Sequence, residues 1–158
     1  MTDHSAAQRA LGAIGDSGIE FVVTEHGPVR SLAEAADARG LTPDRVLKSI
    51  VVRRGEGDHL FVLVPGGRTI SWPKLRGLLG VNRLSMPSAE DALEVTGYER
   101  GTITPFGSSA HLPVIADTSI PTGPVSIGGG AHGVAFTVDS AALVAALKAQ
   151  VADVTEPE

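Results

Sequence analysis

The chain is organised around the stretch Gly97-Tyr98-Glu99-Arg100-Gly101-Thr102-Ile103-Thr104-Pro105-Phe106-Gly107. Its three glycines permit backbone angles that other residues avoid, and Pro105 fixes its own φ, so the stretch suits neither a helix nor a central strand. A loop of this kind can direct several backbone N–H groups at one point, and a ligand can approach the main chain closely at Gly101. We therefore expect it to suit a site that holds a carbonyl or an oxyanion. Taken alone, the stretch is also typical of an ordinary turn after a helix.

Length and composition limit the class of protein. The 158 residues fit one domain, and aromatic residues make up only 4%, so the core must consist mainly of Val, Leu, Ile and Ala. The absence of cysteine excludes disulfides, thiol catalysis and cysteine-ligated metals. A net charge of −5 argues against a free-standing, high-affinity nucleic-acid binder and against a DNA partner, although a small basic site on an acidic body remains compatible with it. No apolar run approaches the length of a membrane span and no signal-peptide core is present, so we expect a cytoplasmic protein with no membrane partner.

The order of apolar and turn residues predicts mixed helices and strands. Helices are expected at 6–14, 32–39, 72–79, 89–96 and 140–149, with a short one from Thr42, and strands at 19–24, 50–52, 60–64, 69–71, 83–86, 113–116, 125–127 and 133–138. Residues 53–59 are expected to form a polar hairpin loop. Because strict strand–helix alternation is absent, the pattern predicts an α+β (mixed α/β) single domain with a curved, partly antiparallel sheet. We expect this domain to span residues 1–152 and the tail 153–158 to be frayed.

Individual polar residues each allow two interpretations. Lys48, at the start of an apolar strand, is either a solvated edge lysine or a cation beside an apolar pocket. Asp117 follows an apolar strand, as a site residue or as a turn aspartate would. His26 lies in a Gly/Pro turn, but no pair of histidines has metal-ligand spacing, so no metal site is expected. Gly128–Gly130 could cradle a phosphate, although neither the Walker pattern nor GxGxxG is present.

Four pieces of the sequence, in this order and spacing, resemble the YbaK/EbsC family, the stand-alone relatives of the editing insertion domain of prolyl-tRNA synthetase. They are Val46-Leu47-Lys48-Ser49, the loop from Gly97 to Gly107, Leu112-Pro113-Val114-Ile115-Ala116-Asp117, and the Gly128–Gly130 turn. The resemblance runs from Glu25-His26-Gly27-Pro28 to the last helix. It favours the functional interpretations of Lys48 and of the loop.

The resemblance implies a trans-acting aminoacyl-tRNA deacylase with a barrel-like mixed sheet flanked by helices and no metal or organic cofactor. The family's GXXXP loop matches Gly101 to Pro105, and its essential lysine matches Lys48. The implied substrate is the 3′ end of a mischarged tRNA, most often tRNA(Pro) bearing alanine or cysteine, and prolyl-tRNA synthetase is a candidate partner. The chain departs from the family at Thr24 and Ser49, which would both line the amino-acid pocket. The remaining expected substrate-binding residues are His26, Thr102, Ile103, Thr104, Phe106, Gly107, Asp117, Gly128 and Gly129.

An aminoacyl ester is already activated, so hydrolysis needs positioning and electrostatics more than a protein nucleophile. We expect Lys48 to fix the terminal phosphate or the carbonyl, and the backbone of residues 101–105 to orient the ester and the water. The ribose 2′-hydroxyl would assist proton transfer, and Asp117 would bind the ammonium group or orient water. Two other classes of function stay open: a binding module that recognises an aminoacyl-adenosine without hydrolysis, and an accessory protein of a synthetase.

Overall fold

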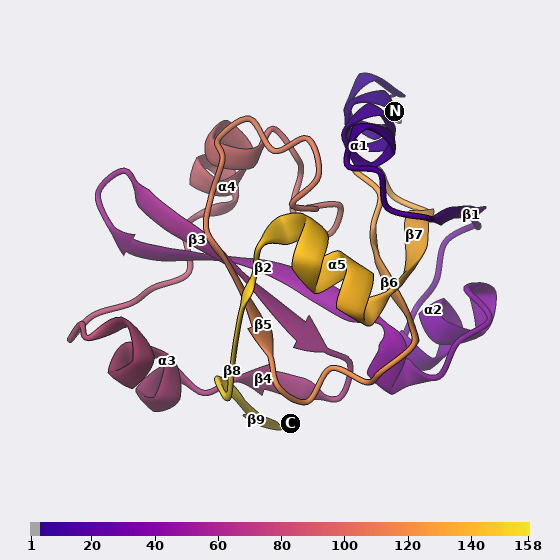
Figure 1. Ribbon diagram of the computed structural model, residues 1–158. Coiled ribbons are helices and arrows are strands. Elements are labelled where there is room, and N and C mark those ends of the chain that lie inside the picture. Colours follow the sequence, from indigo (N-terminus) through magenta and orange to yellow (C-terminus); the bar gives the residue numbers. More distant parts are fainter. Residues whose placement is uncertain (1–3) are drawn as a thin grey trace.

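A computed structural model describes residues 4–158, and its centre is a long hairpin. Strands β2 (Leu47–Gly55) and β3 (Asp58–Pro65) pair antiparallel, and β5 (Val114–Asp117) and β8 (Gln150–Ala152) continue the sheet in parallel, in the order β2-β3-β5-β8. The hairpin crosses the whole molecule in Figure 1. Strand β2 is therefore an edge strand, and one of its two sides is open to other parts of the chain.

The side chains of this sheet alternate between two hydrophobic cores. Phe61 and Leu63 of β3 belong to one core, and Leu60, Val62 and Val64 belong to the other. Strand β3 is buried on both faces, which agrees with its continuous apolar run from Leu60 to Val64. On β2 the same period places Leu47 and Val51 in the first core and Val52 in the second.

Two further sheets complete the β structure. Strands β1 (Val22–Glu25), β7 (Val134–Asp139) and β6 (Pro124–Gly128) form an antiparallel sheet in that order, and a bridge between Val46 and Ser126 joins it to β2. Strands β4 (Arg68–Ile70) and β9 (Thr155–Pro157) form a two-stranded ribbon. The predicted α+β fold with a curved mixed sheet is confirmed, with the strands divided into three sheets and no closed barrel among the described residues.

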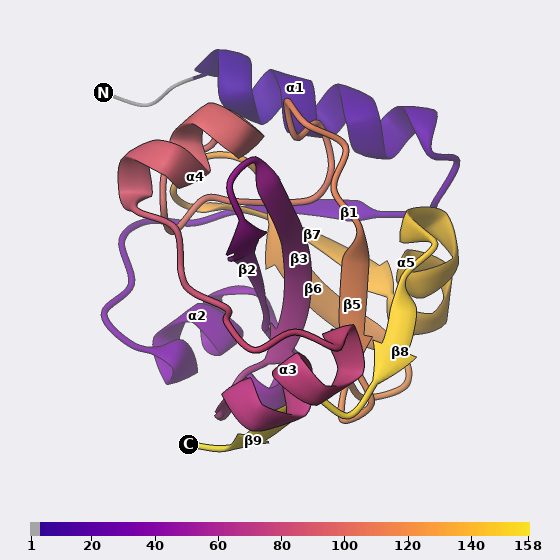
Figure 2. The same ribbon diagram turned by 90° about the vertical axis from the view of Figure 1, so that its left-hand side faces the viewer.

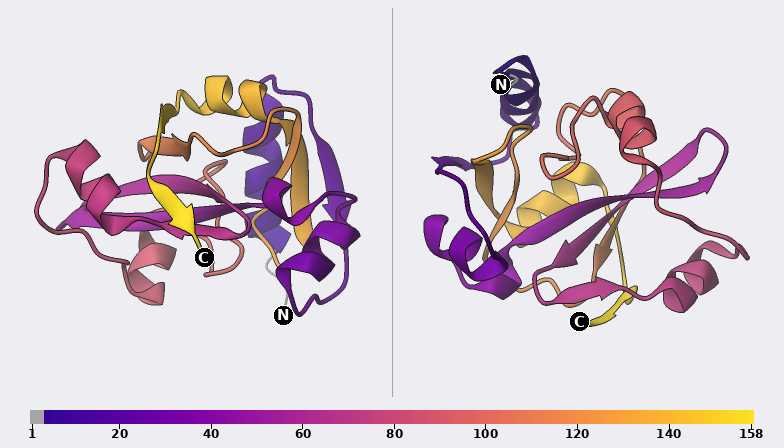
Figure 3. Two further views of the ribbon diagram at one scale, coloured as in Figure 1. Left: turned by 90° about the horizontal axis from the view of Figure 1, so that it is seen from below. Right: turned by 180° about the vertical axis from the view of Figure 1, so that it is seen from behind.

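Five α-helices and one short 3₁₀ helix pack around the described sheets: α1 (His4–Asp16), α2 (Leu32–Ala38), η1 (Pro43–Arg45), α3 (Trp72–Leu79), α4 (Ala89–Thr96) and α5 (Ser140–Leu147). Helix α1 lies across one end of the molecule and α3 lies at the other (Figure 2). Helices α4 and α5 lie on opposite sides of the β2–β3 hairpin (Figure 3). None of the helices in the described part of the chain is long and apolar enough to cross a membrane.

The helix starts follow from local sequence. The side chains of Ser31, Ser88 and Asp139 accept hydrogen bonds of 3.0–3.1 Å from the N–H group three residues further on, as N-caps do. Helix α4 ends at Gly97, whose φ of +79° is the left-handed conformation expected of a C-terminal glycine. Helix α4 therefore leads directly into the glycine loop, as the sequence predicted.

Three local predictions were wrong. Strand β2 starts at Leu47 and continues to Gly55, so residues 53–59 are mostly strand and the turn is confined to Glu56 and Gly57. Residues 83–86 form only an isolated bridge, between Ser85 and Arg53. The tail is not frayed, because β9 pairs with β4 and Val154 is fully buried. The last two errors concern pairing partners that are distant in sequence, Arg53 with Ser85 and β4 with β9.

Candidate active site

A pocket of about 340 Å³ lies along the open edge of β2, beneath the glycine loop. It brings together five residues expected from the sequence: Lys48, Ser49, Gly101, Ile103 and Gly128. These residues come from β2, from the loop after α4 and from the end of β6. The rest of the lining is Arg39, Val46, Leu47, Ile50, Val51, Met86, Pro87, Ala92 and Arg100.

The edge of β2 exposes backbone groups to this pocket. The Val46 carbonyl accepts from Gly66 N–H at the end of β3, whereas Arg53 exchanges both of its peptide hydrogen bonds with Ser85 on the other side of β2. In an antiparallel ladder the direction alternates from one residue to the next, so the peptide groups of Ser49 and Val51 point away from β3. This short segment, between the bridges at Val46 and Arg53, can hydrogen-bond a ligand as a neighbouring strand would.

The glycine loop is held at both ends by α1. Arg9 donates to the carbonyls of Gly97 (2.7 Å) and Gly107 (3.0 Å), and its guanidinium lies 4.7 Å from the ring centroid of Tyr98. Tyr98 is fully buried and its hydroxyl donates to Phe106 O at 2.6 Å. These contacts fix the loop, so its free backbone groups are preorganised.

Two glycines of the site are required by geometry. Gly101 has φ +91°, which L-residues rarely adopt, and a Cβ there would meet only His132 Cε1, at 3.4 Å. A Cβ at Gly128 would lie 3.0 Å from the Ile103 carbonyl, so glycine lets β6 approach the loop. Thr102 N–H is bonded to Glu99 O, whereas the N–H groups of Gly101 and Ile103 have no hydrogen-bond partner within residues 4–158. These two donors are therefore not used by the described part of the protein.

Lys48 and Ser49 leave β2 on opposite faces and differ in their partners. Lys48 Nζ donates to Arg68 O at 2.8 Å and to Glu158 Oε1 at 3.2 Å, and its side chain is 40% exposed. The Ser49 hydroxyl is buried and has no hydrogen-bond partner in the described part of the chain. A buried hydroxyl without a partner costs free energy, which a polar group of a ligand could recover.

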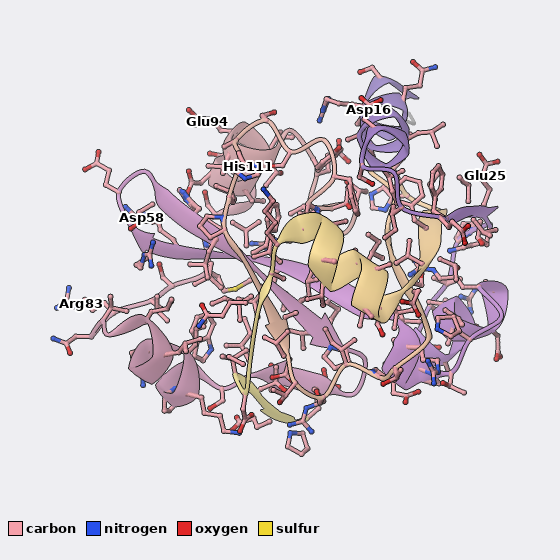
Figure 4. The ribbon with its side chains drawn as sticks, viewed as in Figure 1. Asp16, Glu25, Asp58, Arg83, Glu94 and His111 are labelled. Carbon is pink, nitrogen blue, oxygen red and sulfur yellow. The ribbon has the colours of Figure 1, made fainter. Side chains whose placement is uncertain are left out.

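The other expected residues lie outside the pocket lining. Thr24 pairs with Ala135 in the β1–β7 sheet. Thr102, Thr104, Phe106 and Gly129 are buried. Pro105 and Gly107 line a separate hollow of about 520 Å³ next to His111, which Figure 4 labels. Within the GXXXP loop, Gly101 and Ile103 therefore line the pocket, whereas Thr104 and Pro105 lie outside the lining.

Asp117 is buried at the end of β5, and both of its carboxylate oxygens accept hydrogen bonds from neighbouring residues. Its carboxylate accepts from the N–H and hydroxyl of Ser119 and from Val154 N–H (2.9 Å). Burial would raise the pKa of Asp117, but the hydrogen bonds from Ser119, Val154 and Thr155 outweigh it and hold the pKa below the usual range of a carboxyl. These contacts give Asp117 a structural role: it connects β5 to the segment before β9.

Arg39 is a charged pocket residue that the sequence analysis did not single out. It follows α2 and directly precedes Gly40, a place where a cation is ordinary in any helix. It donates from Nη1 to Ser126 Oγ (3.0 Å) and from Nε to His26 Nε2 (3.4 Å). His26 is thus connected to the pocket through Arg39, although it does not line it.

A larger, more open hollow of about 780 Å³ lies on the other side of Met86 and Pro87. It contains a close pair of His59 Nε2 and Asp91 Oδ2, 2.8 Å apart, and none of the residues expected from the sequence. Within residues 4–158 no group of three or more His, Asp or Glu side chains could hold a metal ion. The smaller pocket is therefore the site with the predicted chemistry.

The fold and this pocket define a small α+β domain with a ligand site between an edge strand and a rigid glycine loop. The chain belongs to the aminoacyl-tRNA editing domain family, whose model matches residues 26–146. The resemblance seen in the sequence is thereby confirmed.

Individual relatives agree with this assignment. The chain is 31% identical over 109 residues to a proline–tRNA ligase of Trichlorobacter lovleyi, covering 68% of this chain and 19% of the ligase. It is 22% identical over 129 residues to EbsC of Enterococcus faecalis, named as a candidate Cys-tRNA(Pro)/Cys-tRNA(Cys) deacylase, covering 81% of this chain and 79% of EbsC. A solved structure described as a candidate trans-editing enzyme for prolyl-tRNA synthetase superposes with a TM-score of 0.86 at 30% identity, covering 96% and 97% of the two chains. The chain spans about a fifth of the length of the proline–tRNA ligases that it matches.

Proposed function

We propose that this protein hydrolyses the ester of mischarged aminoacyl-tRNA in trans and that the pocket at the edge of β2 holds the 3′-terminal aminoacyl-adenosine. One observation carries the proposal: Lys48, Ser49, Gly101, Ile103 and Gly128 line one pocket although they are scattered over 80 positions of the sequence (48 to 128). Its volume of about 340 Å³ is in the range of small-molecule sites.

The reaction needs little from the protein beyond geometry. Water adds to the ester carbonyl carbon, the C–O bond to the ribose breaks, and the ribose oxygen takes up a proton, so a free amino acid and an uncharged tRNA leave. Negative charge develops on the carbonyl oxygen in the transition state, and fixed N–H donors stabilise it. The unpaired N–H groups of Gly101 and Ile103 in the described chain are suited to this role. The substrate's ribose 2′-hydroxyl assists the proton transfer.

The remaining groups position the substrate. Lys48 provides a positive charge at the pocket for the terminal phosphate or the ester carbonyl. The Ser49 hydroxyl, which has no protein partner in the described residues, accepts or donates a hydrogen bond to the aminoacyl group. Pro105 keeps the loop in its conformation from outside the pocket.

The relatives suggest the substrate class. EbsC is named as a Cys-tRNA(Pro)/Cys-tRNA(Cys) deacylase, and the matched structure is described as a trans-editing enzyme for prolyl-tRNA synthetase. We therefore propose tRNA(Pro) carrying a small, wrong amino acid such as alanine or cysteine as the substrate, and prolyl-tRNA synthetase as the partner. Such a substrate implies a cytoplasmic setting. No cofactor is required by the chemistry above.

The test is to incubate the purified protein with a panel of aminoacyl-tRNAs, including Ala-, Cys-, Ser- and Pro-tRNA(Pro), and to follow the loss of ester. We expect rapid loss from at least one mischarged tRNA and none from Pro-tRNA(Pro). Stable esters across the panel, together with binding of an aminoacyl-adenosine analogue, would instead favour a binding module without catalysis.

A further inference from the structure

Three cationic side chains line the pocket, and they differ in what already neutralises them. Lys48 lies beside the carboxylate of Glu158. Arg100 is exposed to water and donates to the carbonyl of Pro87 at 3.2 Å. Arg39 is half-buried, and within residues 4–158 no carboxylate oxygen lies within 4.0 Å of its guanidinium nitrogens. Arg39 is therefore the cation of the pocket that has neither an acid partner nor full hydration.

The guanidinium of Arg39 is held in place by two neutral acceptors. The hydroxyl of Ser126, which is fully buried on β6, accepts from Nη1 at 3.0 Å. The Nδ1 atom of His26 lies 2.8 Å from Gly27 O, which makes it the protonated nitrogen, so Nε2 is free to accept from Arg39 Nε at 3.4 Å. These two contacts use two of the five N–H groups of the guanidinium. The other three N–H groups of Arg39 lie in the same guanidinium plane, so these two contacts fix their directions as well. They have no hydrogen-bond partner in the described residues.

Burial makes this arrangement costly without a ligand. Desolvation lowers the pKa of Arg39 from its ordinary value, because a charge in a poorly hydrated place is less stable than in water. The group nevertheless stays charged at neutral pH, since the ordinary pKa of arginine lies far above neutrality. An anion that enters the pocket recovers the lost solvation, and a planar fork matches the oxygens of a phosphate or a carboxylate.

We propose that Arg39 is the oxyanion-binding residue of this pocket and that it hydrogen-bonds a phosphate or carboxylate of the substrate. The proposal rests on the proposed function for the nature of the ligand. Two parts of an aminoacyl-tRNA 3′ end carry this chemistry: the 5′-phosphate of the terminal adenosine and the side-chain carboxylate of an acidic amino acid. Lys48 then acts beside an anion that Arg39 has already positioned.

The first arm of the test measures binding, which does not depend on catalysis. Calorimetric titration compares adenosine 5′-monophosphate with adenosine on the wild type, on Arg39→Met and on Arg45→Met. Arg45 is the matched control because it is also partly buried and donates only to carbonyls, those of Thr122 and Pro124, at 3.0 Å, but it lies outside the pocket lining. We expect the nucleotide to bind at least about tenfold more tightly than the nucleoside, as for charge-assisted hydrogen bonds. This preference should disappear in Arg39→Met and persist in Arg45→Met.

The second arm identifies the source of the oxyanion. Non-hydrolysable 3′-amide analogues of alanyl- and aspartyl-adenosine, both without a 5′-phosphate, are titrated into the same proteins. If Arg39→Met weakens only the aspartyl analogue, the carboxylate is the ligand, and if it weakens only the nucleotide, the phosphate is. If it weakens neither, the proposal is overturned.

Two controls distinguish a loss of binding from misfolding of a variant and from failure of the proposed function. Circular dichroism and thermal unfolding check each variant, and if Arg39→Met does not fold, Arg39→Lys takes its place. That variant keeps the charge but loses the fork, so weaker binding of the nucleotide or of the aspartyl analogue supports the proposal, and unchanged binding of both contradicts it. A wild type that binds the nucleotide through Arg39 but deacylates no tRNA would disprove the proposed function and leave the oxyanion site standing.

Discussion

Lys48 Nζ lies 3.2 Å from Glu158 Oε1 and 2.8 Å from the carbonyl of Arg68, so the neighbourhood of strand β9 supplies the partners of the pocket lysine. A second lysine has the same kind of partners away from the pocket. Lys74 Nζ on α3 lies 2.9 Å from Asp153 Oδ1 and 2.9 Å from Thr155 O, and its side chain is 42% exposed against 40% for Lys48. The two lysines therefore differ mainly in whether they line the pocket, which makes them a matched pair.

Replacing Lys48 by alanine should remove most of the deacylase activity and leave the fold intact. Loss of one electrostatic contact to the transition state typically costs about 100-fold in rate. Because exposed ion pairs contribute little, the free energy of unfolding should change by no more than about 1 kcal/mol in either variant. Initial rates of ester hydrolysis and urea unfolding curves are compared for Lys48→Ala and Lys74→Ala. Equal activity of the two variants would mean that Lys48 has only a structural role.

Replacing Gly101 by alanine should impair both stability and activity, for separate reasons. The new Cβ would contact only His132 Cε1, at 3.4 Å, but φ +91° is strained for an L-residue and should cost about 1–2 kcal/mol of stability. Gly80 provides the control for this strain, because it has φ +66°, a methyl group added there would meet open space, and it lies outside the pocket lining.

Gly80→Ala should lose a similar amount of stability and keep its deacylation rate, whereas Gly101→Ala should lose activity beyond what the unfolded fraction explains. The measurement is the rate per folded molecule at a temperature where both variants are native. If the two variants have the same rate per folded molecule, the main chain at Gly101 does not contact the ester.

The lowered pKa of Asp117 predicts that the stability of the fold depends on pH. Its pKa is lower in the folded protein than in the unfolded chain, so it stabilises the fold above the unfolded pKa of about 3.9, and this contribution is lost as the pH falls through and below that value. Asp117→Asn should cost about 2 kcal/mol at pH 7, since an amide cannot accept all of the hydrogen bonds from Ser119 and Val154.

The difference between wild type and Asp117→Asn should become smaller at pH 3, which urea unfolding at the two pH values measures. Asp139→Asn is the control, because an exposed N-cap works about equally well with either residue. A gap that stays constant with pH would show that the charge of Asp117 is not what stabilises the fold.

The sequence could predict the parts of the structure that depend on neighbouring residues. Ser88 and Gly97 set the limits of α4 locally, and the family motifs place Lys48 and Gly101 in one site. Contacts between distant segments could not be predicted. Asp117 accepts a hydrogen bond from Val154, 37 positions away, and Arg39 donates one to Ser126, 87 positions away. No local pattern carries such information, since turn aspartates and helix-terminal arginines look alike in every context.

Recognition should concentrate on the aminoacylated 3′ end, with little direct reading of the tRNA body. The chain has 13 Lys and Arg against 18 Asp and Glu. The acids Asp16, Glu25, Asp58 and Glu94 lie around the periphery of the molecule in Figure 4, where they would repel a long phosphate backbone. The cations of the site are few, namely Arg39, Lys48 and Arg100 in the pocket lining.

Each phosphate contact adds about one unit to the slope of log affinity against log salt concentration, so three cations allow a slope of no more than about 3. We therefore expect weak binding of uncharged tRNA, similar deacylation of one small amino acid carried on several different tRNAs, and rejection of larger amino acids by clash near Ser49. Such a pocket separates smaller side chains poorly, because a missing methylene costs only about 1–3 kcal/mol. Choice of tRNA would then come from a synthetase that presents the product.

The measurements are tRNA affinity at several salt concentrations and deacylation rates for alanine on different tRNAs. Nanomolar binding of uncharged tRNA with a steep salt slope would show that the protein reads the tRNA body itself.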